Sequence, residues 1–257
     1  MIDFHSHIVF GVDDGSDSIE TSTKILKEAE KAGFDSIILT PHYMVDYYEV
    51  EKDQINEKIE RLRQACREED IDLTLYQANE IYITNHMIEL LNENKASSIN
   101  DSRYVLFELP MSHESSNLLE VVYSLLENGK IPVIAHPERY SFVQKDPNIL
   151  LELIENGVLL QTNYGSITGQ YGKDVQKTAM LLIKNNFIHF LGSDVHRPHQ
   201  VYGRVDEAIK QLEKILSDKK IEELTHLNAE KVLKDEDIDV DMPTEIKQGF
   251  FQKIFKK

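Results

Sequence analysis

Histidine and carboxylate side chains recur along this 257-residue chain at positions where they could bind metal ions together. In an extended strand, side chains two residues apart point the same way, so His5 and His7 can bind one cation, as can Asp194 and His196. Two such pairs predict more than one ion. Ligand sets that mix imidazole with carboxylate suit manganese, zinc or iron better than magnesium alone. The single cysteine, Cys66, excludes a thiolate-rich zinc site.

Similar side chains follow most of the short apolar runs in the sequence. The runs cover residues 2–4, 36–40, 73–76, 104–107, 132–135, 158–160 and 187–191. The candidate ligands beyond their ends are His5, His7, His42, Glu80, Glu108, His136, Asp194 and His196. Barrel enzymes build their active sites at the carboxyl ends of their strands. The placement therefore predicts one metal site at a shared rim.

Amphipathic helical stretches separate these runs and end at Gly or Asn, as at Gly129, Gly157 and Asn186. These residue types suit the left-handed conformation that terminates a helix. Alternating helices and buried apolar runs predict an α/β fold with about seven parallel strands, in a closed or an open sheet.

Three further charged residues are candidates for the same site. Asp14 lies in Asp13-Asp14-Gly15, which is equally consistent with an ordinary turn and with a further ligand. Arg139 and Arg204 are candidates for binding phosphate oxygens, because guanidinium offers a bidentate fork. The histidines without strand-end placement are expected to be structural or solvent-facing, with His189 in the core: His86, His113, His189, His199 and His226.

The composition of the chain limits the classes of partner that it is expected to bind. A formal net charge of −17 disfavours nucleic acid, because nucleic-acid-binding proteins need a basic face, and it disfavours a nuclease for the same reason. The sequence contains no apolar run of membrane-spanning length and opens without a signal-peptide pattern. We therefore expect a soluble, cytoplasmic protein with no transmembrane segment.

Taken together, these motifs resemble the polymerase-and-histidinol-phosphatase (PHP) family over residues 1–235. The motifs are His5-Ser6-His7, Asp14, Pro41-His42, Glu80, Glu108, His136-Pro137-Glu138-Arg139 and residues 192–196. Within that family, residues 11–15 and 136–140 resemble the manganese-dependent protein-tyrosine phosphatases encoded with bacterial capsule and exopolysaccharide clusters.

The resemblance implies a distorted seven-stranded (β/α)7 TIM-like barrel and a centre of three manganese ions, with iron or zinc as alternatives. The implied ligand sets are His5, His7, Glu80 and Asp194 for one ion, Glu80, Glu108 and His136 for the second, and Asp14, His42 and His196 for the third. The implied catalytic residues are Arg139, Arg204, His42, His136 and Asp194.

The resemblance also implies a substrate, a phosphotyrosine protein such as a bacterial tyrosine kinase of polysaccharide assembly, and hence a role in regulating capsule synthesis. A thiol-dependent phosphatase is excluded, because Asp72 stands six positions after Cys66 where that mechanism needs arginine. Two alternatives stay open: a small-molecule phosphatase such as histidinol-phosphate phosphatase, and a non-catalytic scaffold that binds phosphotyrosine.

Residues 236–257 differ in composition from the rest and are expected to form an acidic connector followed by an amphipathic helix. Apolar residues recur there at helical spacing: Ile246, Phe250, Phe251, Ile254 and Phe255. The expected helix packs on the barrel or on another subunit of a homo-oligomer; the alternative is docking to a partner or an anionic membrane surface.

Overall fold

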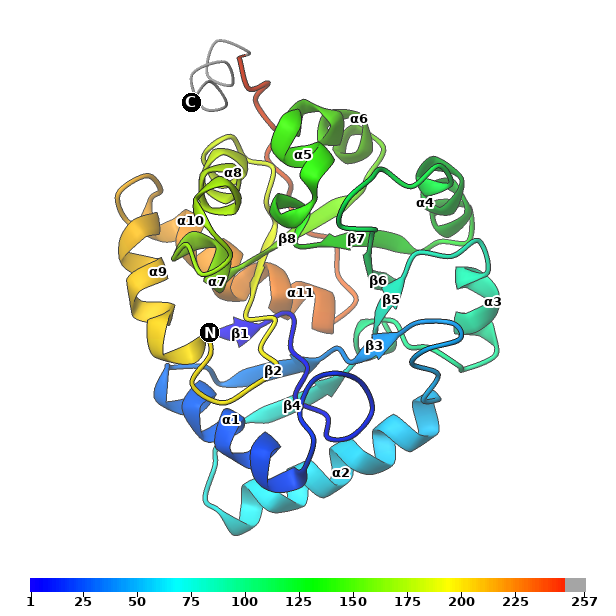
Figure 1. Cartoon of the computed structure of the whole chain (residues 1–257), viewed down its shortest axis with the longest axis vertical. Helices are drawn as coiled ribbons and strands as arrows, with labels where there is room; N and C mark the ends of the chain where they lie inside the picture. The colour runs from blue at the N-terminus through cyan, green and yellow to red at the C-terminus, as the bar shows by residue number, and fades with distance from the viewer. Residues whose placement is uncertain (248–257) are drawn as a thin grey trace.

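The computed structural model of the chain describes residues 1–247, in which helices surround a curled arrangement of short strands (Figure 1). The strands are β1 (Ile2–Asp3), β2 (Ser36–Leu39), β3 (His42–Tyr43), β4 (Thr74–Gln77), β5 (Glu80–Tyr82), β6 (Tyr104–Glu108), β7 (Ile131–Ala135), β8 (Leu159–Asn163) and β9 (Phe190–Gly192). The α-helices are α1 (Ile19–Lys31), α2 (Lys52–Glu68), α3 (Met87–Asn92), α4 (Leu118–Glu127), α5 (Ser141–Lys145), α6 (Leu150–Glu155), α7 (Tyr164–Ile167), α8 (Lys173–Lys184), α9 (Val205–Leu212), α10 (Asp218–Glu222) and α11 (Asn228–Leu233). Within the described residues, no helix combines the length and the apolar character needed to cross a bilayer.

The strands pair in parallel and form a curled sheet, which confirms the predicted α/β class. One sheet has the order β1-β2-β4 and the other the order β3-β5-β6-β7-β8-β9. Just beyond β1 and β9 the backbones meet. The amide of Asp194 donates to the carbonyl of His5 at 2.7 Å, and the amide of His7 donates to that of Val195 at 3.0 Å. The first and last strands therefore lie side by side, and so do the residues that follow them.

The strand count differs from the prediction of about seven, because residues 1–247 contain nine. The expected strands at 36–40 and 73–76 correspond to β2 and β4, and each is followed after two residues by a further short strand, β3 or β5. Pro41 has no N–H to donate between β2 and β3. Asn79 lies between β4 and β5, where its side-chain amide donates to the carbonyl of Pro41 at 3.0 Å and its side-chain oxygen accepts from the amide of Ser97 at 2.9 Å. The break lets these segments change direction close to the rim.

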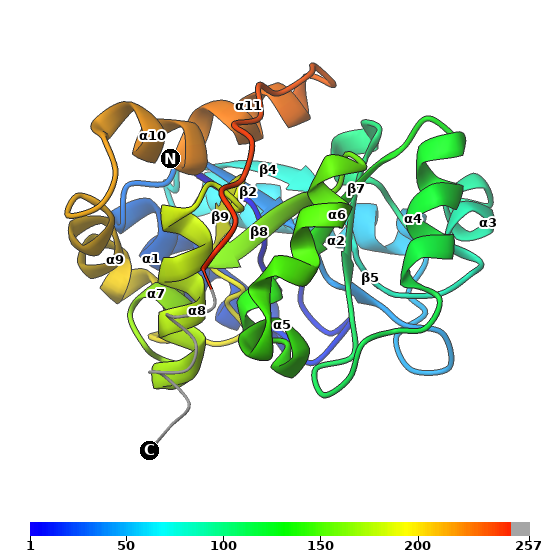
Figure 2. The same ribbon diagram turned by 90° about the horizontal axis from the view of Figure 1, so that it is seen from above.

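Apolar side chains fill the space inside the ring as well as the space between strands and helices. The inner core is contributed by successive strands and by α11: Phe4, Ile38, Ala78, Leu106, Val133, Leu159, Phe190, Ala229 and Val232. Phe4 and Phe190 stack with ring centroids 4.0 Å apart, across the line where the first and last strands meet. Figure 2 shows α10 and α11 on one side of the strands. The inside of the ring is thus a packed core, which leaves the opposite rim for polar residues.

The C-terminal segment follows the body of the protein more closely than the predicted solvated connector. The hydroxyl of Tyr104 donates to the carbonyl of Glu236 at 2.6 Å, and Lys220 pairs with Asp241 at 2.7 Å. Residues 244–247 are not helical, and Ile246 is buried while its backbone exchanges two hydrogen bonds with Asn148. The remainder of the predicted amphipathic helix, residues 248–257, lies outside the described residues.

His189 is a core histidine, as its place within an apolar run predicts. Its ring is buried, and Nδ1 accepts a hydrogen bond from the amide of Leu160 at 3.0 Å, while Nε2 finds no partner among the described residues. Burial lowers the pKa of His189 to about 3. The unfolded chain therefore binds a proton here below about pH 6.5 that the folded chain does not bind.

We predict that His189 lowers the free energy of unfolding as the pH falls from 6.5 towards 3, by about 2 kcal/mol at pH 5. His189→Asn keeps an oxygen that can accept from Leu160 and does not titrate. Urea unfolding at pH 7 and pH 5 should show a smaller acid loss in this variant than in the parent chain, whereas the exposed control His113→Asn should match the parent. Equal acid losses in all three proteins would contradict the assignment.

Candidate metal centre

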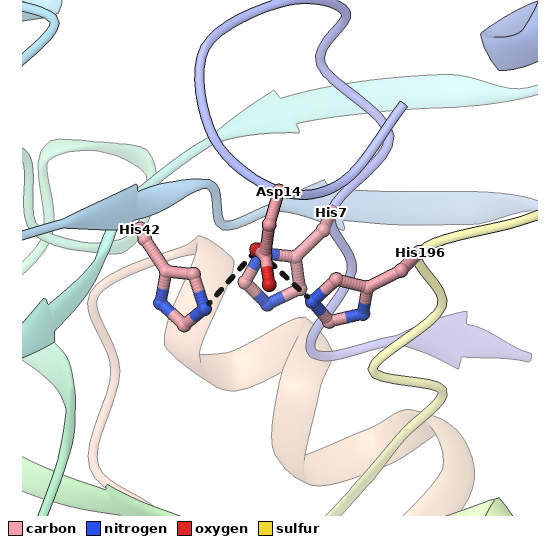
Figure 3. A group of neighbouring side chains, drawn as sticks. All are labelled: His7, Asp14, His42 and His196. Atoms are coloured by element: carbon pink, nitrogen blue, oxygen red, sulfur yellow. Dashed lines mark ion pairs between the residues drawn. The ribbon is translucent and has the colours of Figure 1, made fainter. Parts of the chain in front are cut away.

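The rim opposite α11 gathers histidine and carboxylate side chains from distant parts of the chain. Figure 3 shows His7, Asp14, His42 and His196 converging from the loop after β1, the start of β3 and the segment after β9. A carboxylate oxygen of Asp14 lies 3.6 Å from His42 Nε2 and 3.5 Å from His196 Nε2. This group forms the outer, more exposed part of the cluster.

A second group lies deeper and is centred on Glu80, whose side chain is fully buried at the start of β5. Its Oε2 lies 3.3 Å from Nε2 of His5 and 3.3 Å from Nε2 of His7. The same oxygen lies 3.0 Å from Nδ1 of His42, which in turn lies 3.5 Å from Glu108. Glu80 is therefore shared by two sets of donors.

His136 and Asp194 complete the cluster. Nε2 of His136 lies 2.9 Å from Oε1 of Glu80 and 3.9 Å from Glu108. Oδ1 of Asp194 faces His7, His196 and His5, at 3.4, 3.6 and 3.8 Å respectively. The structure thus brings all nine predicted ligands to one place: His5, His7, Asp14, His42, Glu80, Glu108, His136, Asp194 and His196.

The backbone is shaped to bring these groups together. His136 and Asp194 have positive φ angles of 35° and 53°, a conformation that non-glycine residues adopt at a cost and that concentrates at functional sites. Gly192 leaves no room for a side chain, since a Cβ there would lie 2.6 Å from the Cβ of His5. Close contact between the ends of β1 and β9 therefore depends on a glycine at this position.

The arrangement of the donor atoms is better suited to binding cations than to hydrogen bonding among the donors themselves. Nε2 of His5 and Nε2 of His7 face each other at 3.0 Å in a fully buried setting. Oε2 of Glu80 and Nδ1 of His42 are buried 3.0 Å apart, yet neither has a properly directed hydrogen bond within residues 1–247. Buried polar atoms without partners are rare. Their lone pairs converge on the same spaces, as expected of a ligand set for metal ions.

The charges of the cluster also indicate a site that binds cations. Burial alone would raise the pKa of Glu80, yet the neighbouring His5 and His42 hold it well below its usual range. Burial would lower the pKa of His5, but Glu80 and Asp194 raise it to about 9. Burial and the charge of Glu80 raise the pKa of Glu108 to about 8. The site therefore attracts positive charge strongly, whether as protons on imidazole or as cations.

Three polar residues that the sequence patterns did not single out orient the predicted ligands. Oδ2 of Asp13 accepts from Nδ1 of His7 at 2.7 Å and from the amide of His42 at 3.0 Å. The side chain of Gln161 lies 2.9 Å from Nδ1 of His5, and Asn163 donates to Oδ2 of Asp194 at 2.7 Å. The sequence did offer a signal. Asp13 precedes Asp14 in the same turn, and Gln161 and Asn163 are two residues apart at the end of β8.

The arginines have different surroundings. Nη1 of Arg139 donates to Oδ2 of Asp194 at 2.7 Å, which places its guanidinium at the cluster. Arg204 instead donates to the carbonyl of Thr168 at 3.0 Å and pairs with Glu207 at 3.0 Å, and none of its contacts within residues 1–247 is to a predicted ligand. Arg197, which was not predicted, donates to the backbone carbonyls of Asp14, Gly15 and His196 and so ties two ligand segments together.

This arrangement can be compared with known proteins. Residues 1–234 match the family described as "Capsular polysaccharide synthesis, CpsB/CapC". The chain belongs to this family. It is 33% identical to the tyrosine-protein phosphatase YwqE of Bacillus subtilis (strain 168), over 98% of this chain and 100% of that protein. It is 32% identical to the tyrosine-protein phosphatase CpsB of Streptococcus pneumoniae, over 92% and 99%.

A solved structure from two of these relatives has the same fold as this chain. The chain superposes with a TM-score of 0.90 and 32% identity on a chain from the crystal structures of YwqE from Bacillus subtilis and CpsB from Streptococcus pneumoniae, described there as unique metal-dependent tyrosine phosphatases. The match covers 96% of this chain and 100% of the other. The predicted resemblance to the capsule-associated branch is confirmed.

More distant structures share only the fold. A histidinol phosphate phosphatase from Lactococcus lactis, solved with zinc, histidinol and phosphate, gives a TM-score of 0.54 at 17% identity. It covers 83% of this chain and 92% of that one. An amidohydrolase from Mycoplasma synoviae gives 0.60 at 12% identity, over 100% of this chain and 93% of that one. Similar curled sheets thus occur in proteins of different activity.

We predict that divalent cations stabilise the folded protein through the buried donors. Adding Mn²⁺ to chelator-treated protein, at about a hundred times its dissociation constant, should stabilise the native state by about 3 kcal/mol and raise the melting temperature by about 5–10 °C. Glu80→Gln removes the shared charge with little change in shape and should lose most of this shift. The exposed control Glu89→Gln should keep it, and a full shift in Glu80→Gln would contradict the role of Glu80.

Asp13 should act on metal affinity without donating to the ion. We predict that Asp13→Asn, which keeps the shape of the side chain but loses its charge, weakens Mn²⁺ binding about 10- to 100-fold, because His7 loses the partner that fixes its ring. Titration calorimetry on the chelated protein measures the effect. Asp46→Asn, in the exposed turn after β3, serves as control, and unchanged affinity in Asp13→Asn would disprove the prediction.

Proposed function

We propose that this chain is a metal-dependent protein-tyrosine phosphatase that hydrolyses phosphotyrosine in a protein substrate. The proposal depends above all on one observation: nine imidazole and carboxylate side chains converge at the strand ends with a guanidinium beside them. Relatives that match this chain over almost its full length are named tyrosine-protein phosphatases. Close similarity over the whole length supports the transfer of that activity.

We propose that three ions, manganese in the first place and iron or zinc as alternatives, occupy the cluster. The proposed sets are His5, His7, Glu80 and Asp194; Glu80, Glu108 and His136; and Asp14, His42 and His196. Bound ions supply Lewis-acid stabilisation of charge on phosphate and lower the pKa of water. The protein's own contribution is to hold the donors rigidly, because Asp13, Gln161 and Asn163 each orient one ligand.

Arg139 is the proposed phosphate-binding residue of the chain. Its guanidinium can offer two parallel N–H groups to phosphate oxygens, and its position beside Asp194 puts it within the cluster. Contact of Arg204 with phosphate stays a prediction, since Arg204 is engaged by Thr168 and Glu207. His42, His136 and Asp194 are proposed to act as ligands.

A thiol nucleophile has no support in this chain. Cys66 is buried within α2, and burial raises the pKa of its thiol, so the reactive thiolate is disfavoured. The leaving group of the proposed substrate is a phenol with an ordinary pKa of about 10, which departs more readily than an aliphatic alcohol. The proposed hydrolysis therefore uses water as the nucleophile, without a phosphorylated cysteine, and releases phosphate and tyrosine.

We also propose that the two sheets close into one distorted barrel of seven strands. On this view β2 with β3, and β4 with β5, each count as one interrupted strand, and the hydrogen bonds between residues 4–7 and 191–195 close the ring. Residues 1–235 then form the phosphatase domain and residues 236–257 an appended segment. A closed ring explains how strands from both ends of the chain share a rim.

The proposed substrate is a bacterial tyrosine kinase of polysaccharide assembly, and the proposed role is regulation of capsule or exopolysaccharide synthesis. Membership of a capsular polysaccharide synthesis family supports this choice. A kinase that phosphorylates its own tyrosines would supply the phosphomonoester that the site is suited to hydrolyse.

We predict that the Mn²⁺-loaded protein hydrolyses a phosphotyrosine peptide with a higher kcat/KM than either a phosphoserine peptide or histidinol phosphate. His136→Ala should lower kcat/KM by at least about a hundredfold, because a buried donor that lies beside Glu80 is lost. The exposed control His86→Ala should match the parent. Preference for histidinol phosphate would favour the small-molecule alternative, and binding of the peptide without turnover would favour the scaffold.

A further inference from the structure

The five residues after α7, Thr168–Gly172, form a compact turn that we name the Tyr171 loop. Gly169 and Gly172 have positive φ angles of 77° and 99°, which favour glycine. The amide of Gln170 donates to the carbonyl of Gly165 at 2.9 Å, and that of Gly172 donates to Gly169 at 3.1 Å. The shape of this loop is therefore fixed by its own backbone.

The loop is also held from outside. Nη2 of Arg204 donates to the carbonyl of Thr168 at 3.0 Å, and the side-chain amide of Gln176 donates to the carbonyl of Ile167 at 2.8 Å. Both contacts are to main-chain oxygens at the junction between α7 and the loop. Arg204 therefore helps to hold this loop in place.

The ring of Tyr171 is presented by this loop to the metal-site rim. A Cβ at Gly165 would lie 3.0 Å from Cε2 of the ring and 3.0 Å from Oε1 of Gln170, so the ring packs closely against the backbone of Gly165. The same ring lies under the guanidinium of Arg139, with Cζ 4.7 Å from the ring centroid. This distance is within the range of a cation–π contact.

Arg139 has few other restraints. Within residues 1–247 its side chain makes one hydrogen bond, from Nη1 to Oδ2 of Asp194, and it is 28% exposed. Asn163 donates to the same oxygen at 2.7 Å, so Asp194 is fixed independently of Arg139. A single hydrogen bond leaves a guanidinium free to turn about it, whereas a flat ring against its face restricts that turn.

We infer that Tyr171 is a positioning residue. It holds the guanidinium of Arg139 in the orientation in which its N–H groups can bind the phosphate of the substrate. The inference rests on the proposed function, because it takes Arg139 as the group that contacts phosphate. Tyr171 acts through its ring face and so does not itself need to touch the substrate. Its effect should fall on phosphate binding, which is common to the ground state and the transition state, and therefore on KM more than on kcat.

The first test compares Tyr171→Leu with Tyr171→Phe in the Mn²⁺-loaded, full-length protein. Tyr171→Leu should raise KM for a phosphotyrosine peptide about tenfold with kcat within about twofold, the effect expected of losing one partly desolvated cation–π contact. Tyr171→Phe keeps the ring and should restore KM to within about twofold of the parent. Tyr123→Leu makes the same change on the exposed face of α4 and is the matched control.

A second variant displaces the same ring by changing a neighbouring residue. Gly165→Ala brings a methyl group to 3.0 Å from the ring of Tyr171 and from Oε1 of Gln170, so both side chains must move by a few tenths of an ångström. The variant should raise KM in the same direction without altering Tyr171 itself. Circular dichroism and the Mn²⁺-induced rise in melting temperature establish that each variant folds and binds metal. If Tyr171→Leu does not fold, Gly165→Ala still tests the inference.

Calorimetric binding of inorganic phosphate to the Mn²⁺-loaded proteins separates this inference from the proposed function. Phosphate binding that is about tenfold weaker in Tyr171→Leu than in the parent supports the inference. It would do so even if the parent chain failed to hydrolyse phosphotyrosine, an outcome that would overturn the proposed function alone. Parent-like KM and phosphate affinity in Tyr171→Leu, or equal impairment in Tyr171→Phe, would overturn the role of the ring.

Discussion

A carboxylate without exposure to water governs the architecture of this site. Glu80 is fully buried, and transfer of a charged carboxylate from water costs several kcal/mol unless opposite charge compensates it. The compensation comes from imidazoles that reach Glu80 from three directions: His5, His42 and His136. His5 and His136 follow β1 and β7, and His42 begins β3, so the arrangement of these strands determines which charges surround Glu80. Cations at the same place would compensate the charge more completely than protons, because one ion can be shared by several ligands.

The separation of apolar and polar layers along the strands follows from the need to compensate the buried charge of Glu80. Below the rim, Phe4 and Phe190 stack inside the ring, and Ala229 and Val232 of α11 cover that end. Residues directly after the same strands provide the ligands. Packing of the inner core thus places the ends of β1 and β9 beside each other, and His5 and Asp194, each two residues beyond its strand, reach the rim together.

Much of the fold and of the candidate site could be predicted from the sequence, because a strand's apolar run and the polar residue beyond its end are both visible there. His5 with His7, and Asp194 with His196, were identified in this way. The short strands β3 and β5 were not predicted, because their separation from β2 and β4 depends on how Asn79 reaches Pro41 from another segment. The supporting roles of Gln161 and Asn163 were not predicted either, because their spacing at the end of β8 is a signal only if uncharged amides are considered beside the charged candidates. Arg204 had a reasonable residue type for phosphate, but only tertiary structure reveals its engagement by Thr168 and Glu207.

The meeting of the first and last strands has a consequence for synthesis on the ribosome. His5 and His7 leave the ribosome at the start of translation, but Asp194, which closes the same ligand set and whose amide binds the carbonyl of His5, follows almost two hundred residues later. Contacts between such distant positions form slowly. Until then the emerging chain carries exposed histidines without the geometry of the proposed metal site, so that site can assemble only after most of the polypeptide has left the ribosome.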